Sequence, residues 1–289
     1  MADVPAGPID KDRARRAFGR AATAYDEIAV LQRTVGQRML ERLDLVRLQP
    51  RVVLDAGAGT GLHAADLLRR YRKAQVLALD FALPMLHQAR RRGGWRRRPV
   101  CVCGDLEHLP LADASVDLLY SNLALQWVND LAAAFREAGR VLRPGGLLMF
   151  TTFGPDTLKE LNAAWAQVDG ASHVSPFVDM HDVGDLLVQA RFADPVMDAE
   201  WLTLTYPDLA GVMRDLKGIG AANATRDRPR GMTGKGRLRD LAAAYESFRA
   251  PDGRLPATYE VIYGHAWVPE QRQVAGETRI SVDTLRRRS

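Results

Sequence analysis

The stretch V-V-L-D-A-G-A-G-T-G at residues 52–61 decides the fold that we expect for this chain. Its first three residues form a short apolar run, as in a parallel strand that is buried on both faces. Three glycines follow at alternate positions, where they permit positive φ angles and let a ligand lie against bare backbone. Apolar residues at helical spacing then run from Leu62 to Tyr71. The pattern predicts a strand, a glycine turn and a helix.

The spacing of the glycines separates two classes of nucleotide site. A dinucleotide-binding loop runs G-x-G-x-x-G, and its third glycine would fall at position 62, which is Leu62. The observed order, D-x-G-x-G-x-G, resembles the first motif of class I S-adenosylmethionine (SAM) methyltransferases. The alternative is a tight strand-to-helix turn in any α/β protein. The resemblance implies that the methionine part of SAM is held by Asp55 and by the backbone of Gly57, Ala58, Gly59 and Gly61.

Two further predicted strands also end in acidic residues. Asp80 follows the strand 75–79, where its two oxygens suit the two ribose hydroxyls or, alternatively, the start of a helix at 82–91. Asp105 follows the strand 100–103, where it can accept a hydrogen bond from the adenine amino group while Leu106 packs on the ring. Ligands bind at the carboxyl edge of such sheets. We therefore predict the cofactor site there, with Phe81 also in it.

The fourth predicted strand, 116–120, leads into the segment S-N-L-A-L-Q-W-V at 121–128. In the methyltransferase family this loop faces the transferred methyl group. The resemblance implies that Trp127 and Leu125 exclude water and that Asn122 bonds the polar end of the cofactor. A helix at 130–142, ended by L-R-P-G-G, and a fifth strand at 147–152 follow.

The chain ends differ from this repeating pattern. Residues 1–10, with two prolines and a glycine, are expected to be disordered. Residues 11–50 predict a helical cover with helices at 11–18 and 24–48, and Phe18 and Tyr25 would contact the pocket. The alternative is an ordinary amphipathic segment that caps the sheet. Residues 271–289 form a C-terminal tail.

Residues 51–270 predict one α/β domain, a Rossmann-like seven-stranded and mostly parallel sheet with helices on both faces. Strand six lies within 192–206, and an alternating run at 257–268 predicts an antiparallel last strand. Helices are expected at 155–168, 179–190, 207–220 and 237–249. The insertions near 155–190 and 207–255 leave the sheet near its ligand edge, so we expect them to form a lid that encloses substrate.

The composition indicates a soluble globular protein, and because the N-terminal residues contain no apolar signal core we expect it to be cytoplasmic. Hydrophobic residues make up 47% of the 289 residues and charged residues 26%, and no apolar run approaches the roughly 18 residues of a membrane span. Cys101 and Cys103 are the only cysteines, and we expect them to form neither a disulfide nor a metal pair. The net charge is +5, and the arginines of 90–98 suit an acidic partner, nucleic acid or plain solvation.

With the insertions included, residues 13–269 resemble the malonyl-[acyl-carrier protein] O-methyltransferases of biotin synthesis. Part of the likeness recurs in a mitochondrial complex I assembly factor that hydroxylates arginine, at H-V-S-P-F (173–177) and P-A-T-Y (256–259). The segments that carry the resemblance to the biotin enzymes are F-G-R-A-A-T-A-Y (18–25), L-D-A-G-A-G-T-G (54–61), S-N-L-A-L-Q-W (121–127), F-T-T-F-G-P-D-T-L-K-E-L (150–161) and M-R-D-L-K-G-I-G-A (213–221).

This resemblance implies methyl transfer from SAM to the free carboxylate of a malonyl thioester, carried by a carrier protein or by coenzyme A. The carboxylate is already ionised, so we assign no nucleophile and no general base. A hydroxylase or assembly factor, another small-molecule methyltransferase and a nucleic-acid binder are the alternatives. The residues expected to position the substrate are Tyr25, Arg20, Arg214, Lys217 and Trp127, and those expected to dock an acidic carrier are Lys217, Arg226, Arg228, Arg230 and Lys235.

Overall fold

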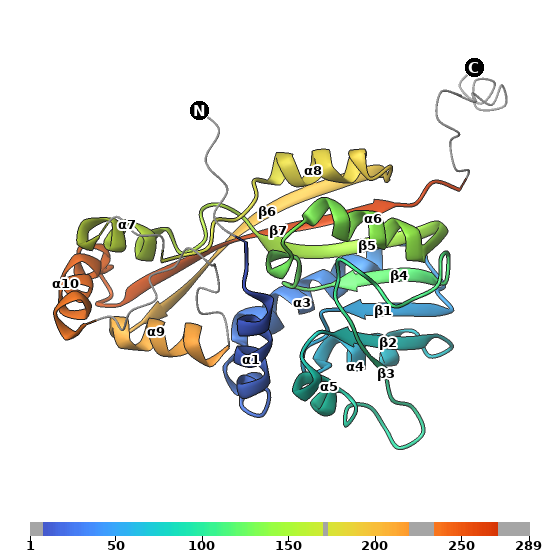
Figure 1. Cartoon of the computed structure of the whole chain (residues 1–289), viewed down its shortest axis with the longest axis horizontal. Helices are drawn as coiled ribbons and strands as arrows, with labels where there is room; N and C mark the ends of the chain where they lie inside the picture. The colour runs from blue at the N-terminus through green and yellow to red at the C-terminus, as the bar shows by residue number, and fades with distance from the viewer. Residues whose placement is uncertain (1–7, 170–172, 220–233, 271–289) are drawn as a thin grey trace.

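The computed structural model of the chain describes residues 8–169, 173–219 and 234–270 (Figure 1). Its centre is one seven-stranded sheet in the order β3-β2-β1-β4-β5-β7-β6. β7 runs antiparallel to β5 and β6, and the other neighbouring pairs are parallel. The predicted Rossmann-like sheet with an antiparallel last strand is therefore confirmed. The strands are β1 (Val52–Ala56), β2 (Gln75–Asp80), β3 (Val100–Cys103), β4 (Val116–Ser121), β5 (Leu142–Phe153), β6 (Ala193–Tyr206) and β7 (Leu255–Trp267).

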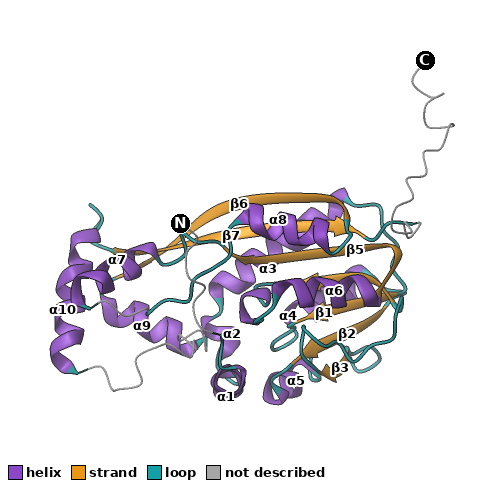
Figure 2. Ribbon diagram, turned by 45° about the horizontal axis from the view of Figure 1, so that its top comes forward, coloured by secondary structure: helices purple, strands orange, loops and turns teal. Residues whose placement is uncertain are grey.

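β1 lies between β2 and β4, so the apolar run that begins the glycine motif is buried by strands and helices on all sides. Val53 and Leu54 have no exposed surface and belong to the hydrophobic clusters on opposite faces of the sheet. One cluster includes residues of α3 (Val30–Arg42) and α4 (Leu62–Arg70), and the other includes residues of α6 (Leu131–Val141) and α8 (Met180–Gln189). The helices thus cover both faces (Figure 2), and the loops at the strand ends remain for the site.

The N-terminal cover is more broken than its sequence predicts. α1 (Lys11–Ala21) begins at Asp10, whose side chain accepts a hydrogen bond from the Arg13 amide. The single helix expected at 24–48 is wrong: the segment forms α2 (Tyr25–Ile28), α3 and a 3-10 turn at Leu43–Leu45. Ala29, with φ −76° and ψ 50°, leaves the helical conformation and separates α2 from α3. This break lets Tyr25 turn toward the sheet edge.

A smaller difference concerns the L-R-P-G-G segment, which was expected to end α6 before strand five. The segment belongs to β5 itself. Val116 pairs with Leu142, but Leu118 pairs with Leu147, so the intervening residues of β5 bulge out of the ladder.

β5, β6 and β7 are long strands, and helices gather around the ends of β6 and β7 (Figure 1). These helices are α7 (Lys159–Val168), α9 (Leu209–Gly218) and α10 (Lys235–Tyr245). α5 (Leu83–Ala89) packs instead on β2 and β3, next to α1. α8 packs on α6 and β6. A lid role for both insertions remains a prediction. In the described ranges, no helix combines the length and apolarity needed to cross a bilayer.

Candidate functional site

The glycine turn joins β1 to α4 with three left-handed residues. Gly57, Gly59 and Gly61 have φ values of 79°, 54° and 78°. A Cβ atom on Gly57 would lie 2.2 Å from the Cβ of Ala124, and one on Gly61 would lie 2.8 Å from the Cα of Ala89, so packing excludes side chains there. A Cβ on Gly59 would meet no atom within 4 Å. Gly59 therefore presents open backbone, as the approach of a ligand requires.

Two adjoining cavities lie at this edge of the sheet, with volumes of about 640 and 470 Å³ including their open mouths. The sizes are those of small-molecule sites. Tyr25, Gly57, Gly59 and Asn122 line both cavities and therefore mark their junction. Other predicted residues on the first cavity are Asp80, Phe81, Asp105, Leu106 and Trp127, and on the second are Asp55 and Ala58. Gly61 lies on neither wall and begins α4.

Asp80 is held at the first cavity by backbone amides. Its Oδ2 accepts from the Gly59 amide at 2.9 Å and its Oδ1 from the Ala82 amide at 2.7 Å. Burial raises the pKa of Asp80 to about 6, against the opposing effect of these hydrogen bonds. The side chain thus accepts from the amide of Ala82, the residue before α5, and also forms part of the cavity wall, with acceptor lone pairs left for hydroxyl donors. The ribose assignment remains a prediction.

Two buried acceptor atoms without partners face the second cavity. Asp55 is 2% exposed, and its Oδ2 and the Oε1 of Gln32 have no hydrogen-bond partner among the described residues. Burial raises the pKa of Asp55 to about 7, and nearby His63 opposes the rise. Unpartnered buried acceptors are costly. Their convergence on one cavity fits a cationic donor group such as the ammonium of a bound amino acid.

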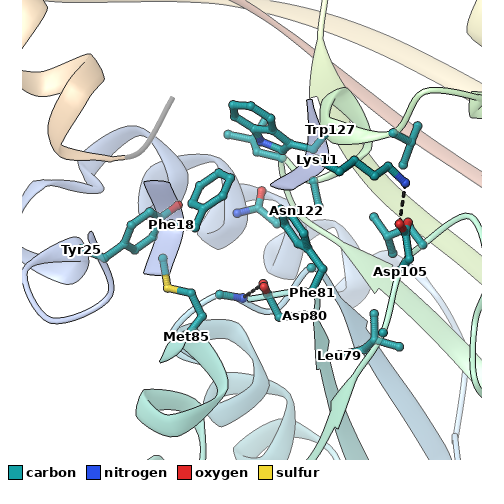
Figure 3. A pocket seen from close by; sticks show the side chains of 17 residues that line it. Lys11, Phe18, Tyr25, Leu79, Asp80, Phe81, Met85, Asp105, Asn122 and Trp127 are labelled. Carbon is teal, nitrogen blue, oxygen red and sulfur yellow. Dashed lines mark hydrogen bonds and ion pairs between the residues drawn. The ribbon is translucent and has the colours of Figure 1, made fainter. Parts of the chain in front are cut away.

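Asp105 carries an ion pair that its sequence did not predict. The Lys11 ammonium, from the first residue of α1, lies 2.6 Å from the Oδ2 of Asp105 and also pairs with Glu107 (Figure 3). Glu107 in turn accepts hydrogen bonds from the amides of Asn129 and Asp130. The predicted adenine acceptor is therefore part of a network that ties α1 to the loops after β3 and β4.

Aromatic side chains from distant segments surround the first cavity (Figure 3). The rings of Phe18 and Trp127 pack edge to face with their centroids 5.0 Å apart, and the centroids of Phe18 and Phe81 are 6.0 Å apart. Asn122 is fixed by Thr151, which donates to its Oδ1, and by the Gln32 carbonyl, which accepts from its Nδ2. Trp127 and Asn122, expected to exclude water and to orient a polar group, thus lie on the same cavity wall, whereas Leu125 is buried in the hydrophobic core and lines neither cavity.

The N-terminal cover is fastened to the glycine turn. The Thr60 hydroxyl donates to the Oδ1 of Asp26 at 2.5 Å, and Arg92 pairs with the same carboxylate. Tyr25, next to Asp26, is directed at the cavities, and burial together with the charges of Asp80 and Asp26 raises the pKa of its hydroxyl far above its usual value. Tyr25 is therefore a neutral hydrogen-bond donor at the junction.

The structure does not bring the other predicted substrate residues to the cavities. Arg20 on α1 and Arg214 and Lys217 on α9 are exposed and belong to neither cavity wall. Arg214 points away from the core because Val212 and Leu216 occupy the buried face of α9. Lys235 is exposed at the start of α10. Arg226, Arg228 and Arg230 lie outside the described residues.

Lys11, Gln32, Arg33 and Met85 also line the cavities, and sequence reasoning missed them. Lys11 stood out in the sequence as the start of a helix and Met85 as part of an apolar face, but neither position signals a ligand. Gln32 and Arg33 lie inside the helix that was expected to run unbroken. In the described ranges, no group of three or more His, Cys, Asp or Glu side chains is arranged to hold a metal ion.

Comparison with known proteins gives consistent matches. Residues 54–150 match the methyltransferase domain family. The chain is 54% identical to the malonyl-[acyl-carrier protein] O-methyltransferase of Halorhodospira halophila over 285 residues, 97% of each chain. It is 58% identical to the Methylovorus sp. protein of the same name over 271 residues, 91% of each. A Bacillus halodurans crystal structure described as a methyltransferase superposes with a TM-score of 0.59 at 18% identity, covering 82% of this chain and 99% of that one.

Proposed function

The chain belongs to the family of malonyl-[acyl-carrier protein] O-methyltransferases, and from that premise we propose that it methylates the free carboxylate of a malonyl group carried as a thioester. It is a SAM-dependent methyltransferase by its domain and its relatives. Its similarity to these relatives over nearly the whole chain favours this function over a hydroxylase or assembly factor. The observation that carries the proposal is the pair of adjoining cavities, which meet at Tyr25 and Asn122.

The residues of the two cavities fit SAM. Asp55 and Gln32 would accept from the methionine ammonium, because both present an unpartnered buried oxygen. Asp80 would accept from the ribose hydroxyls, and Asp105 from the adenine amino group once Lys11 shares that carboxylate. When bound, SAM supplies a methyl group on a positively charged sulfur, whose transfer to a carboxylate oxygen leaves a methyl ester and S-adenosylhomocysteine.

The protein aligns the two reactants and excludes water from them, and it does not need to transfer a proton. A malonyl carboxyl has an ordinary pKa of about 4 and is ionised at neutral pH, so it needs no base. Holding the two reactants in line can supply roughly 7–11 kcal/mol. Phe18 and Trp127 form an apolar wall near the junction. Because opposite charges neutralise each other as the methyl group is transferred, such a wall favours the reaction.

The substrate carboxylate requires a donor while it is desolvated. Tyr25 is our first assignment, since its neutral hydroxyl belongs to both cavity walls. Arg20, Arg214 and Lys217 remain proposed partners that would reach the carboxylate after a movement of α1 or α9. Trp127 would position the malonyl group against the junction.

The methyl ester hides a negative charge, so fatty-acid enzymes can extend the acyl chain. We assign the reaction to the early, pimeloyl stage of biotin synthesis, in the cytoplasm. Malonyl-acyl carrier protein is the proposed substrate, because the relatives are named for it, and malonyl-coenzyme A is the alternative.

Mass spectrometry of malonyl-acyl carrier protein incubated with the chain and SAM tests the proposal. We expect the mass of one methylene to be added and then removed by an esterase. A chain that binds SAM in calorimetry but adds no methyl group to either malonyl thioester would refute the proposed function.

A further inference from the structure

Positive charge is concentrated in two short segments that pack against each other. Residues 11–21, which form α1, contain five basic residues and one acidic residue. Residues 81–104, which include α5, contain six arginines and no acidic residue. Together these segments hold more formal positive charge than the net +5 of the whole chain. The rest of the molecule therefore carries a net negative charge, and the positive charge is local.

The two segments also lie side by side in space. α1 contacts α5, and a Cβ atom on Gly19 would lie 3.3 Å from the side chain of Pro84 (Figures 1 and 2). Lys11, Arg92 and Arg97 are used internally, by Asp105, by Asp26 and by backbone carbonyls of the α4 end. Six of the other eight arginines form what we name the basic face. Its members are Arg16, Arg20, Arg90, Arg91, Arg96 and Arg98, all exposed and without an ion pair to a described carboxylate.

Apolar surface accompanies this charge. Trp95 is 81% exposed, and the Arg96 guanidinium lies over its ring at 4.5 Å from the centroid. Leu83, in the first turn of α5, is 52% exposed. An exposed tryptophan stacked with arginine is a typical centre of a protein contact. Its combination with a basic face suits a folded acidic protein.

The position of the basic face relates it to the site. α1 carries Arg16 and Arg20, and the segment that follows α5 carries the other four arginines and Trp95, while Lys11, Phe18 and Met85 of the two helices line the first cavity. A partner bound across this face would therefore contact the outer surface of α1, the helix whose inner surface forms a wall of the cavity. An acyl group on a flexible arm has a short path from such a partner to the junction.

We propose that the basic face, with Trp95, is the docking surface for the acidic acyl carrier protein that presents the malonyl group; this rests on the proposed function. Charge complementarity carries the assignment, since acyl carrier proteins are acidic and positive surface steers such partners. The surface lies on α1 and on the segment that follows α5, and it is separate from the α9–α10 region to which carrier docking was first assigned.

The test uses the full-length chain and two substrates, malonyl-acyl carrier protein and malonyl-N-acetylcysteamine, whose short arm is uncharged. The triple variant Arg16→Glu/Arg96→Glu/Arg98→Glu should raise the KM for the carrier at least about tenfold at low salt. Its KM for the small thioester and its Kd for SAM should stay within about twofold. Added salt should weaken carrier turnover by the natural chain but not by the variant.

The matched control is Arg191→Glu/Lys235→Glu/Arg239→Glu, which makes the same charge change in exposed residues after α8 and on α10. An equal loss in this control, or an unchanged carrier KM in the first variant, would overturn the proposal while leaving methyl transfer intact. Tighter binding of a DNA duplex than of the carrier, lost in the first variant, would also overturn it. A natural chain inactive on both thioesters would instead refute the proposed function. If the triple variant is inactive on the small thioester, the double variant Arg96→Glu/Arg98→Glu takes its place in the same KM measurements.

Discussion

Two carboxylates in different regions of this sheet are almost equally buried but differ in their partners. Asp55, at the glycine turn, is 2% exposed and leaves one oxygen without a hydrogen-bond donor. Glu160, on α7 beside the beginning of β7, is 7% exposed and accepts hydrogen bonds from both the amide and the hydroxyl of Thr258. Nearby Glu260, also 7% exposed, accepts from the Asp156 amide.

The difference separates a proposed binding group, Asp55, from a structural one, Glu160. A buried carboxylate whose donors come from its own fold stabilises that fold, whereas one that lacks a donor costs stability until a ligand supplies it. Burial by itself therefore does not identify a functional acid. The missing donor, together with a cavity, does.

Replacing Asp55 should have the largest effect. Asp55→Asn removes the charged acceptor of the ligand ammonium, which is worth about 1.5–3 kcal/mol, so we expect SAM to bind roughly 10–150 times more weakly. The ligand-free variant should be more stable than the natural chain at pH 8, because it no longer buries a charge. Calorimetry and denaturant unfolding give the two values, and a less stable variant would contradict the binding role.

The direction of this stability change with pH follows from the raised pKa of Asp55. Folded Asp55 titrates near 7 and the unfolded group near 4, so the folded state binds the extra proton between these values. The contribution of Asp55 to stability therefore falls as the pH rises through this window. The stability advantage of Asp55→Asn should shrink to nothing near pH 4–5.

The opposite result is expected from Glu160. Glu160 accepts two hydrogen bonds with its two carboxylate oxygens. Glu160→Gln replaces one of these oxygens by an NH2 group, which cannot accept, so the free energy of unfolding should fall by about 1.5–3 kcal/mol. The Kd for SAM should not change, since the side chain is remote from both cavities. A Glu160→Gln variant with normal stability and weak SAM binding would contradict the structural role that we assign to Glu160.

Acid should weaken ligand binding by a smaller amount. Because a ligand ammonium requires the ionised form of Asp55, with its pKa near 7, the Kd for SAM should rise about tenfold from pH 8 to pH 6. Asp55→Asn should abolish most of this dependence. A residual slope in that variant measures the share of Asp80, whose pKa is about 6.

The smallest effects concern the proposed substrate residues. Tyr25→Phe removes one neutral hydrogen bond worth about 0.5–1.5 kcal/mol, so the KM for the malonyl substrate should rise roughly 2–10-fold while SAM binding is kept. Arg214→Ala is the companion variant. A raised KM there would show that α9 moves to the substrate, and an unchanged KM would remove Arg214 from the carboxylate site.

Sequence predicted most of the sheet, because buried strands and the glycine turn are local signals; β3 has the bounds expected for it. It missed the break at Ala29, since alanine carries no signal for a helix end. It missed Lys11 and Gln32, whose places depend on how the cover folds over loops 94 and 90 residues away. It also assigned Arg214 to the substrate site, although helical spacing alone does not show which way this side chain points, and that role remains a prediction.

The strand order has a consequence for the growing chain on the ribosome. β7 is inserted between β5 and β6, so β6 emerges before the strand that pairs with it. The first five strands, with the glycine turn and the acidic loop ends, are complete by residue 153, about a hundred residues before β7 begins at Leu255. The nucleotide-binding half can therefore form early during translation. The half that we expect to enclose the substrate is joined to it only when β7 has been synthesised.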